Sequence, residues 1–559
     1  MEAALAACAL PSLRILNTKP RFRCSFSNPS LPISPNSLIT RKSSRFTTAV
    51  SSPPSSSAAT STNSPPEPEA LFEPGSDKFD WYANWYPVMP ICDLDKKVPH
   101  GKKVMGIDLV VWWDRNEKQW KVMDDTCPHR LAPLSDGRID QWGRLQCVYH
   151  GWCFNGSGDC KLIPQAPPDG PPVHTFKQAC VAVYPSTVQH EIIWFWPNSD
   201  PKYKNIIETN KPPYIPELED PSFTKLMGNR DIPYGYDVLV ENLMDPAHVP
   251  YAHYGLMRFP KPKGKYIICI SNSCFNPFTN LQILLAEKID REGGKPLEIN
   301  VKKLDNKGFF SKQEWGYSNF IAPCVYRSST DPLPEQEHEY PAPAASDKAA
   351  LSKRRLSLIF ICIPVSPGRS RLIWTFPRNF GVFIDKIVPR WVFHIGQNTI
   401  LDSDLHLLHV EERKILERGP ENWQKACFIP TKSDANVVTF RRWFNKYSEA
   451  RVDWRGKFDP FLLPPTPPRE QLFDRYWSHV ENCSSCKKAH KYLNALEVIL
   501  QIASVAMIGV MAVLKQTTMS NVARIAVLVA AVLSFAASKW LSHFIYKTFH
   551  YHDYNHAVV

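Results

Sequence analysis

Two short stretches of this 559-residue chain decide its fold: Thr126–Arg130 reads TCPHR, and Gln146–Trp152 reads QCVYHGW. Each stretch contains one cysteine and one histidine, and seventeen residues separate the first histidine from the second cysteine. The four side chains are Cys127, His129, Cys147 and His150. Thiolates and imidazoles are metal ligands, so the two stretches predict a pair of loops that hold one metal centre.

Two kinds of centre take two thiolates and two imidazoles. In a Rieske [2Fe-2S] cluster, imidazoles replace two thiolates on one iron, which raises the reduction potential and suits the cluster to accept an electron from a ferredoxin. A Cys2His2 zinc site is the alternative, but such sites pair cysteine with cysteine and histidine with histidine. Here each loop supplies one of each. We therefore expect a Rieske domain over residues 80–200.

A second candidate metal site lies in the segment ENLMDPAHVPYAH. It contains Asn242, Asp245, His248 and His253. Histidines five residues apart can reach one metal from a helix that loosens near Pro250, and a carboxylate from elsewhere would complete the two-His-one-carboxylate triad of non-haem Fe(II) oxygenases. Two histidines in an aromatic-rich segment are usually structural. Because Asp245 lies one helical turn before His248, downstream of a Rieske motif, we favour an iron site.

Together the two motifs resemble the large subunit of Rieske non-haem iron oxygenases. That resemblance implies an aspartate as third iron ligand on a later helix, where Asn398–Arg413 offers Asp402 and Asp404. We choose Asp404, because it precedes an apolar stretch, and keep Asp402 as the alternative. Either residue could instead cap a helix or lie on an exposed helix face.

The same resemblance implies a role for Asp245 that is not iron binding. In this family the corresponding aspartate bridges the iron-bound histidine, here His248, to a cluster imidazole, here His150, of a neighbouring subunit. The resemblance therefore implies a head-to-tail homotrimer, which is a closed cyclic assembly. A carboxylate in that position also fixes the imidazole tautomers.

The N-terminal region has the composition of a transit peptide. Between Ala3 and Pro66 there is no acidic residue, while seven basic residues occur among many Ser, Thr and Pro residues, which favours a plastid over a mitochondrion. A permanently disordered linker is the alternative for the Ser/Pro tract near residue 52. Without residues 1–66, which also include Glu2, the formal charge falls from +12 to about +6. We expect no nucleic-acid partner.

The C-terminal region contains two apolar segments, residues 493–514 and 522–540. The first is long enough to span a bilayer and the second is near the lower limit, so we predict a two-helix membrane anchor. A buried helical hairpin is the alternative.

Just before the two apolar segments, Cys483 and Cys486 form a C-x-x-C motif, which can be a redox dithiol, half of a metal site or two cysteines in a helix turn. No second C-x-x-C completes a zinc site, and flanking lysines would lower the thiol pKa, so we favour a switch addressed by thioredoxin.

The complete set of features resembles the pheophorbide a oxygenase group of plastid Rieske oxygenases, with length and pattern closest to its protochlorophyllide-dependent translocon component. The resemblance implies a ferredoxin-dependent monooxygenase that uses O2 to oxygenate a chlorophyll-type tetrapyrrole, in particular the methyl of protochlorophyllide a. It also implies a chloroplast inner envelope or thylakoid location with the catalytic domain facing the stroma. The alternative is a redox-regulated translocon component with little or no turnover.

The expected fold class is α+β. An all-β Rieske domain precedes an oxygenase domain over residues 210–470, in which helices that carry the iron ligands cover one face of an antiparallel sheet. Apolar runs at Val104–Trp113 and Trp120–Asp124 predict one hairpin, and runs at Leu358–Val365 and Arg371–Pro377 predict another.

Overall fold

The structure is a computed structural model. It describes residues 78–254, 256, 296–313, 315–330, 354–459, 462–515 and 518–556. The predicted transit peptide, residues 1–66, lies outside the described residues.

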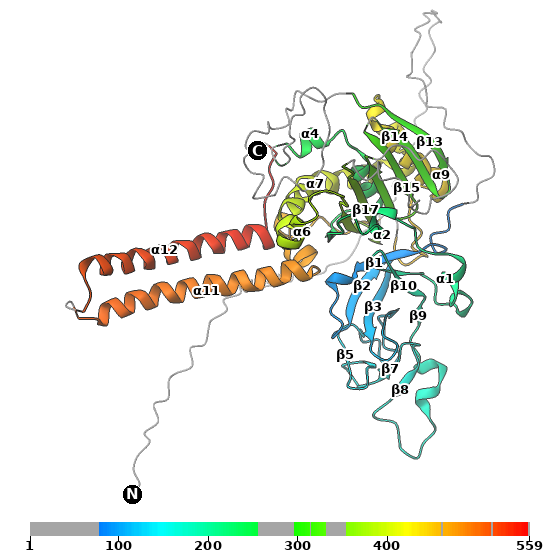
Figure 1. Cartoon of the computed structure of the whole chain (residues 1–559). Coiled ribbons are helices and arrows are strands. Elements are labelled where there is room, and N and C mark those ends of the chain that lie inside the picture. Colours follow the sequence, from blue (N-terminus) through cyan, green and yellow to red (C-terminus); the bar gives the residue numbers. More distant parts are fainter. Residues whose placement is uncertain are drawn as a thin grey trace, which may run out of the picture. The chain divides into compact units, whose positions relative to one another are not determined.

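Three small antiparallel sheets form the Rieske domain within the described part of the chain. Their strand orders are β1-β11-β10, β2-β3-β4-β9 and β5-β6-β7-β8. The strands are β1 (Tyr86–Pro90), β2 (His100–Val104), β3 (Ile107–Asp114), β4 (Gln119–Asp124), β5 (Arg138–Ile139), β6 (Leu145–Gln146), β7 (Cys153–Phe154), β8 (Cys160–Leu162), β9 (Val183–Tyr184), β10 (Ser186–Gln189) and β11 (Ile192–Phe195). Figure 1 shows them in blue and cyan.

The predicted hairpin before the first cluster loop is confirmed, because β3 pairs with β4 and places Trp113 opposite Trp120. Its expected first residue, Val104, instead ends β2. A turn at Met105 and Gly106, both with positive φ, leads from β2 into β3, as in tight hairpins. The sequence alternation did not reveal this turn, because Met105 is apolar like the strands around it.

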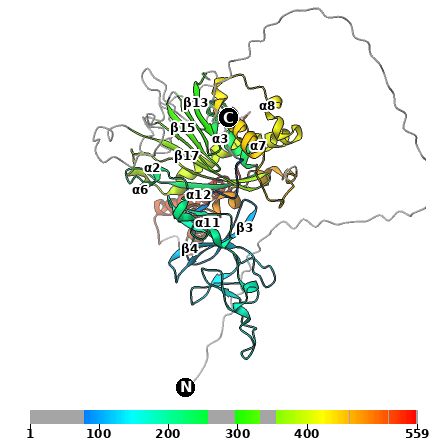
Figure 2. The same ribbon diagram turned by 90° about the vertical axis from the view of Figure 1, so that its right-hand side faces the viewer.

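One antiparallel sheet organises the oxygenase domain. Among the described residues it has seven strands in the order β12-β18-β17-β16-β15-β14-β13. The strands are β12 (Met227–Ile232), β13 (Ile299–Asp305), β14 (Gly308–Gln313), β15 (Gly316–Ile321), β16 (Val325–Ser329), β17 (Ser357–Ser366) and β18 (Arg369–Thr375). The second predicted hairpin is confirmed as β17 and β18, with Ile361 opposite Ile373. Figure 2 shows β13, β15 and β17 of this sheet.

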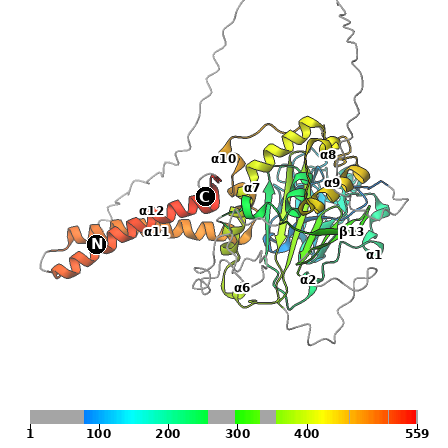
Figure 3. The ribbon, with the colours of Figure 1, turned by 90° about the horizontal axis from the view of Figure 1, so that it is seen from above.

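Helices pack over this sheet. Among the described residues, the α-helices before the C-terminal hairpin are α1 (Ile206–Thr209), α2 (Pro216–Glu219), α3 (Tyr236–Met244), α4 (Val249–Ala252), α6 (Ile384–Ile387), α7 (Arg390–Arg418), α8 (Trp423–Ala426), α9 (Ala435–Ser448) and α10 (Arg469–Leu472). Helix α3 contacts β16–β18 and α9 contacts β13 and β14, while the Tyr236 ring of α3 lies against Phe440 and Phe444 of α9. Figure 3 shows α7, α8 and α9 together beside the strands. The expected α+β class is confirmed.

The Rieske and oxygenase domains share one apolar core. Trp81 and Trp85 pack in the same buried cluster as Trp374 of β18 and Trp443 of α9. At the β2–β3 turn, the Met105 N–H donates to the carbonyl of Pro364, at the end of β17, at 2.8 Å. These contacts hold the two domains of one chain together.

The two apolar C-terminal segments form long helices, α11 (Ser484–Val513) and α12 (Asn521–Ile545), which lie side by side (Figure 1). Both are long and apolar enough to cross a membrane. Their apolar side chains are exposed along the hairpin: Val505 is 69% exposed, and Val532 is 66% exposed. Within the described residues nothing covers these side chains, which favours the predicted membrane anchor over a buried hairpin.

Candidate metal centres

The two predicted cluster loops have the same backbone geometry. In each loop the cysteine N–H donates to the carbonyl five residues later, at 2.9 Å for both Cys127 and Cys147. The N–H of the residue four positions after each cysteine donates back to that cysteine's carbonyl, at 2.9 Å in the first loop and 3.0 Å in the second. These two residues have positive φ angles, 58° for Leu131 and 76° for Gly151. A leucine rarely adopts this conformation, so the first loop is a strained turn of the kind found at functional sites.

The four predicted cluster ligands come together between these loops. Cys127 and Cys147 are 1% and 2% exposed, and the rings of His129 and His150 lie 4.4 Å apart. His129 stacks on Trp152 at 4.7 Å, which fixes the ring, and its Nδ1 is buried without a hydrogen-bond partner. A buried ring nitrogen with no partner is costly unless a metal occupies its lone pair. The donor set therefore fits a [2Fe-2S] cluster.

Apolar side chains surround this pair of loops at the surface. Leu131, Val148 and Tyr149 are 75%, 64% and 60% exposed, and all three are loop residues beside the ligands. We call these three residues the cluster rim. Exposed apolar patches of this kind mark protein interaction sites.

The predicted iron ligands also meet. The Nε2 atoms of His248 and His253 lie 3.1 Å apart, and Asp404 Oδ2 lies 3.6 Å from His253 Nε2 and 3.9 Å from His248 Nε2. Two imidazoles and one carboxylate that face a common point are the facial triad of non-haem iron sites. The predicted loosened helix near Pro250 is wrong in detail: α3 ends at Met244, and the one-turn helix α4 separates the two histidines.

Ser403 determines the tautomer of His253, and the sequence did not suggest this role. Its Oγ lies 2.6 Å from the Ile400 carbonyl and therefore donates to it, because a carbonyl can only accept. The same Oγ lies 2.7 Å from His253 Nδ1, so it accepts the Nδ1–H. The lone pair of His253 is then on Nε2, which faces His248 and Asp404. Ser403 is a positioning residue.

The electrostatics of the triad reflect its burial. Burial raises the pKa of Asp404 to about 6, although the charge of His248 opposes this. Burial also holds the pKa of His253 well below its ordinary value, so this imidazole is neutral, as a metal ligand must be. At His248 burial lowers the pKa, but Asp245 and Asp404 outweigh it and the net shift is upward.

Asp402, the alternative ligand, has a different environment. Its carboxylate lies 2.7 Å from Arg230 Nη1 and 2.5 Å from Arg475 Nη2, and all three side chains are buried. A carboxylate held between two guanidinium groups is an ion-pair centre, and its charge is already balanced. Asp404 is therefore the aspartate that the fold places with the two histidines.

Asp245, the predicted bridge, lies at the edge of the triad. Its Oδ2 is 3.4 Å from His248 Nδ1, on the side away from the triad, and its Oδ1 accepts the Ala247 N–H at 2.7 Å. The side chain is 24% exposed, so a neighbouring molecule could reach it. A cavity of about 530 Å³ is lined by Ser403, Phe473, Tyr554 and His556, among other residues.

The C-x-x-C motif lies in a setting that the sequence did not suggest. Cys483 and Cys486 are 0% and 2% exposed, and two buried histidines, His394 and His479, lie against them. The expected activation by a flanking lysine is wrong for Lys487, because its ammonium pairs with Glu481 at the surface at 2.5 Å. The thioredoxin switch stays a prediction. His479 is four residues before Cys483, which was the available sequence signal, whereas His394 is distant in sequence.

Comparison with known proteins agrees with a cluster site and a mononuclear iron site. The Rieske [2Fe-2S] domain family matches residues 84–185, and the pheophorbide a oxygenase family matches residues 320–422. Flavonoid 8-hydroxylase 2, chloroplastic, from Ocimum basilicum is 53% identical over 96% of this chain and 95% of its own length. Pheophorbide a oxygenase, chloroplastic, from Oryza sativa subsp. japonica is 32% identical over 89% of this chain and 88% of its own. Protein TIC 55, chloroplastic, from Pisum sativum is 27% identical over 74% of this chain and 71% of its own.

The similarity to two oxygenases covers both predicted metal sites and nearly the whole length of each chain. A Rieske cluster and a mononuclear iron are the cofactors of such enzymes, and the buried donor sets described above fit both groups. This chain belongs to the pheophorbide a oxygenase group of Rieske non-haem iron oxygenases.

Proposed function

We propose that this enzyme is a ferredoxin-dependent monooxygenase that hydroxylates an aromatic ring of a flavonoid. The observation that carries the oxygenase chemistry is the triad of His248, His253 and Asp404, whose ligand atoms face one another within 3.9 Å. The flavonoid substrate rests on the relative that is 53% identical over almost the full length of both chains.

The overall reaction balances with one O2, two electrons and two protons, which convert a ring C–H into C–OH and release one water. The cluster supplies single electrons, and the mononuclear iron, when bound, supplies oxygen activation. The residues of the chain orient these groups. Ser403 directs the His253 lone pair inwards, and the stack of His129 on Trp152 holds one cluster imidazole in place.

The test is turnover with isotopic oxygen. The full-length protein in detergent would receive reduced ferredoxin, a panel of flavones and 18O2, and mass spectrometry would follow the products. We expect one 18O atom in a hydroxyl of the flavone, and none from an Asp404→Ala control that lacks a triad carboxylate. Full iron content with no flavonoid product would overturn the substrate assignment.

A chlorophyll-type tetrapyrrole is the second candidate substrate. It is supported by the match of the pheophorbide a oxygenase family to residues 320–422 and by the relative that is 32% identical. We rank it second because that similarity is lower than the similarity to the flavonoid hydroxylase. Pheophorbide a and protochlorophyllide a belong in the same panel, and oxygenation of either in place of the flavones would select this candidate.

The electron path that we propose uses the cluster rim and Asp245. The exposed Leu131, Val148 and Tyr149 would dock ferredoxin and, in a homotrimer, the neighbouring subunit. Asp245 would then join His248 to His150 of that neighbour. Asp245→Asn should keep both metal centres and lose turnover, whereas Asp453→Asn, at an exposed position, should retain it. Full turnover in Asp245→Asn would contradict the path.

The location that we propose is a chloroplast membrane, the inner envelope or the thylakoid, with the catalytic domain facing the stroma. It is supported by the two apolar helices and by the chloroplastic relatives. A translocon component without turnover is a weaker reading, supported by the TIC 55 relatives at 27% identity. The fold assembles both metal-ligand sets, which a role without turnover would not require.

A further inference from the structure

We infer that His394, His479, Cys483 and Cys486 form a structural Zn²⁺ site at the base of the membrane hairpin. Cys483 is the N-cap of α11 and Cys486 lies in its first turn. His394 lies in the first turns of α7, and His479 lies in the π-helical turn Tyr476–Val480. The ligand atoms of all four side chains lie within 4.8 Å of one another, and each residue is at most 2% exposed. This site is separate from both iron centres, which use other residues.

The distances suit a tetrahedral metal. His394 Nδ1 lies 3.5 Å from Cys483 Sγ and 3.4 Å from Cys486 Sγ, and His479 Nε2 lies 3.2 Å from Cys486 Sγ. Around a tetrahedral zinc, with Zn–S of about 2.3 Å and Zn–N of about 2.0 Å, neighbouring nitrogen and sulfur ligands are about 3.5 Å apart. Only small movements would be needed to close the shell.

Backbone carbonyls orient both imidazoles for metal binding. His394 Nε2 lies 3.2 Å from the Met227 carbonyl, and His479 Nδ1 lies 2.5 Å from the Asn229 carbonyl. Because a carbonyl only accepts, these ring nitrogens carry the protons. The other nitrogen of each ring therefore directs its lone pair at the thiols, which is the arrangement found behind zinc-bound histidines.

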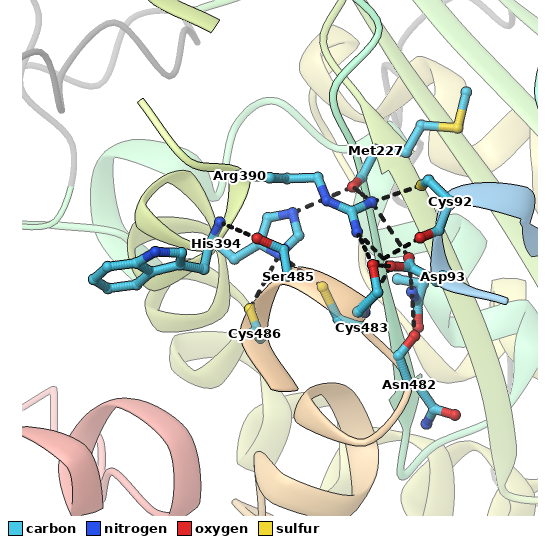
Figure 4. A network of polar contacts seen from close by, with 12 residues as sticks. Cys92, Asp93, Met227, Arg390, His394, Asn482, Cys483, Ser485 and Cys486 are labelled. Atoms are coloured by element: carbon cyan, nitrogen blue, oxygen red, sulfur yellow. Dashed lines mark hydrogen bonds and ion pairs between the residues drawn. The ribbon is translucent and has the colours of Figure 1, made fainter. Parts of the chain in front are cut away.

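The charges around the site also balance. Zinc binding would release one proton from each thiol, and two thiolates neutralise the charge of Zn²⁺ in this buried position. The nearby guanidinium of Arg390 does not upset that balance, because it pairs with Asp93 and donates to the Met227 carbonyl at 3.1 Å (Figure 4). Asp93 also accepts the Ser484 N–H at 2.9 Å, which fixes the C-x-x-C turn.

A redox dithiol fits this environment less well. Thiol exchange requires access to a sulfur atom, and here an apolar shell of Val480, Leu541, Ile545 and Phe549 surrounds the cysteines. A metal would instead join three parts of the fold: α11, the turn before it and α7. His394 and Asp404 are ten residues apart on α7, which is about 15 Å of helix, so the site would anchor the helix that carries the third iron ligand.

Element-specific X-ray absorption on the full-length protein in detergent tests this inference directly. We expect about one zinc per chain, with two sulfur ligands at about 2.3 Å and two nitrogen ligands at about 2.0 Å. Less than about one zinc per ten chains after expression with added zinc, or a zinc shell without sulfur, would overturn it. Zinc misplaced in the iron triad would have no sulfur ligand and would disappear in Asp404→Ala.

Variants provide a second test. Cys483→Ser combined with Cys486→Ser should lose the zinc and keep the iron, and His394→Gln should lower zinc content at least tenfold. Cys427→Ser, at a half-buried cysteine outside the group, is the matched control and should keep the zinc. If the double variant fails to fold, the thiols of the parent protein are probed instead. Their alkylation should be slow until a zinc chelator is added, and alkylation that responds to reduced thioredoxin but not to the chelator would overturn the site.

Discussion

The chain contains two groups of two cysteines and two histidines that differ in almost every structural respect. The cluster group, Cys127, His129, Cys147 and His150, lies on two matching loops under an exposed apolar rim. The anchor group, His394, His479, Cys483 and Cys486, is completely buried where α7 meets the membrane hairpin. The same residue types therefore occur at one site that partners can reach and at another that they cannot.

The histidines show what this difference means. His129 has a buried Nδ1 without a partner and is held by stacking on Trp152, so its electronic properties depend on the cluster. His394 and His479 are each held by a backbone carbonyl of β12. An electron-transfer site needs a partner surface, whereas a structural site needs rigidity and balanced charge.

The largest expected effect concerns the iron triad, which receives the electron from the cluster group. Asp404→Ala removes the triad carboxylate, so we expect loss of the mononuclear iron and a fall in hydroxylation beyond the ~10–100-fold caused by losing a residue behind a ligand. The cluster signal in electron paramagnetic resonance and the zinc content should remain. Asp402→Ala is the matched change, and it should lower thermal stability because it leaves Arg230 and Arg475 unpaired. Equal iron loss in both variants would contradict the distinction.

The next effect separates the two groups by redox potential. His150→Cys gives the cluster a third thiolate, and we expect its potential to fall on the order of hundreds of millivolts, towards all-cysteine clusters. His479→Cys in the anchor group should leave the cluster potential unchanged. A redox titration followed by electron paramagnetic resonance measures both. An unchanged potential in His150→Cys would remove this residue from the cluster.

A smaller effect tests whether the fixed tautomer of His253 increases the affinity of the triad for iron. Ser403→Ala removes the acceptor of the His253 Nδ1–H, and we expect iron affinity to fall about 10–100-fold with little change in stability. Ser403→Thr keeps a hydroxyl and should restore most of the affinity. Iron retention against a graded chelator is the measurement, and equal retention in Ser403→Ala and the parent would show that the serine is only a packing residue.

The smallest effect concerns the rim that only the cluster group has. Tyr149→Ser should raise the KM for ferredoxin about tenfold or weaken subunit association by a similar factor, because aromatic side chains dominate interface energies. Phe428→Ser changes a residue that is 91% exposed elsewhere and should alter neither. Steady-state kinetics with ferredoxin and analytical ultracentrifugation separate the two outcomes. If both variants behave alike, the rim is not a docking surface.

The sequence predicted those features that depend on short motifs or local pattern. The C-x-H and C-x-x-H spacing, the β3–β4 and β17–β18 hairpins and the apolar length of α11 and α12 are local, and the structure has each of them. The neighbours of Asp404 and Asp402 depend on how α7 faces α4 and the π-helical turn, so the sequence left both open as iron ligands. The sequence hid the anchor group for the same reason, because His394 and His479 are 85 positions apart along the chain.

The division into an electron-transfer group and a structural group is tested most directly by measuring iron and zinc in one sample. Full-length protein would be reduced with ferredoxin, and X-ray absorption at the iron and zinc edges would be recorded before and after reduction. We predict an iron edge that shifts to lower energy on reduction, together with a zinc edge and a two-sulfur, two-nitrogen zinc shell that do not change. Absence of zinc, or a zinc or sulfur environment that changes with reduction, would contradict the division into an electron-transfer group and a structural group.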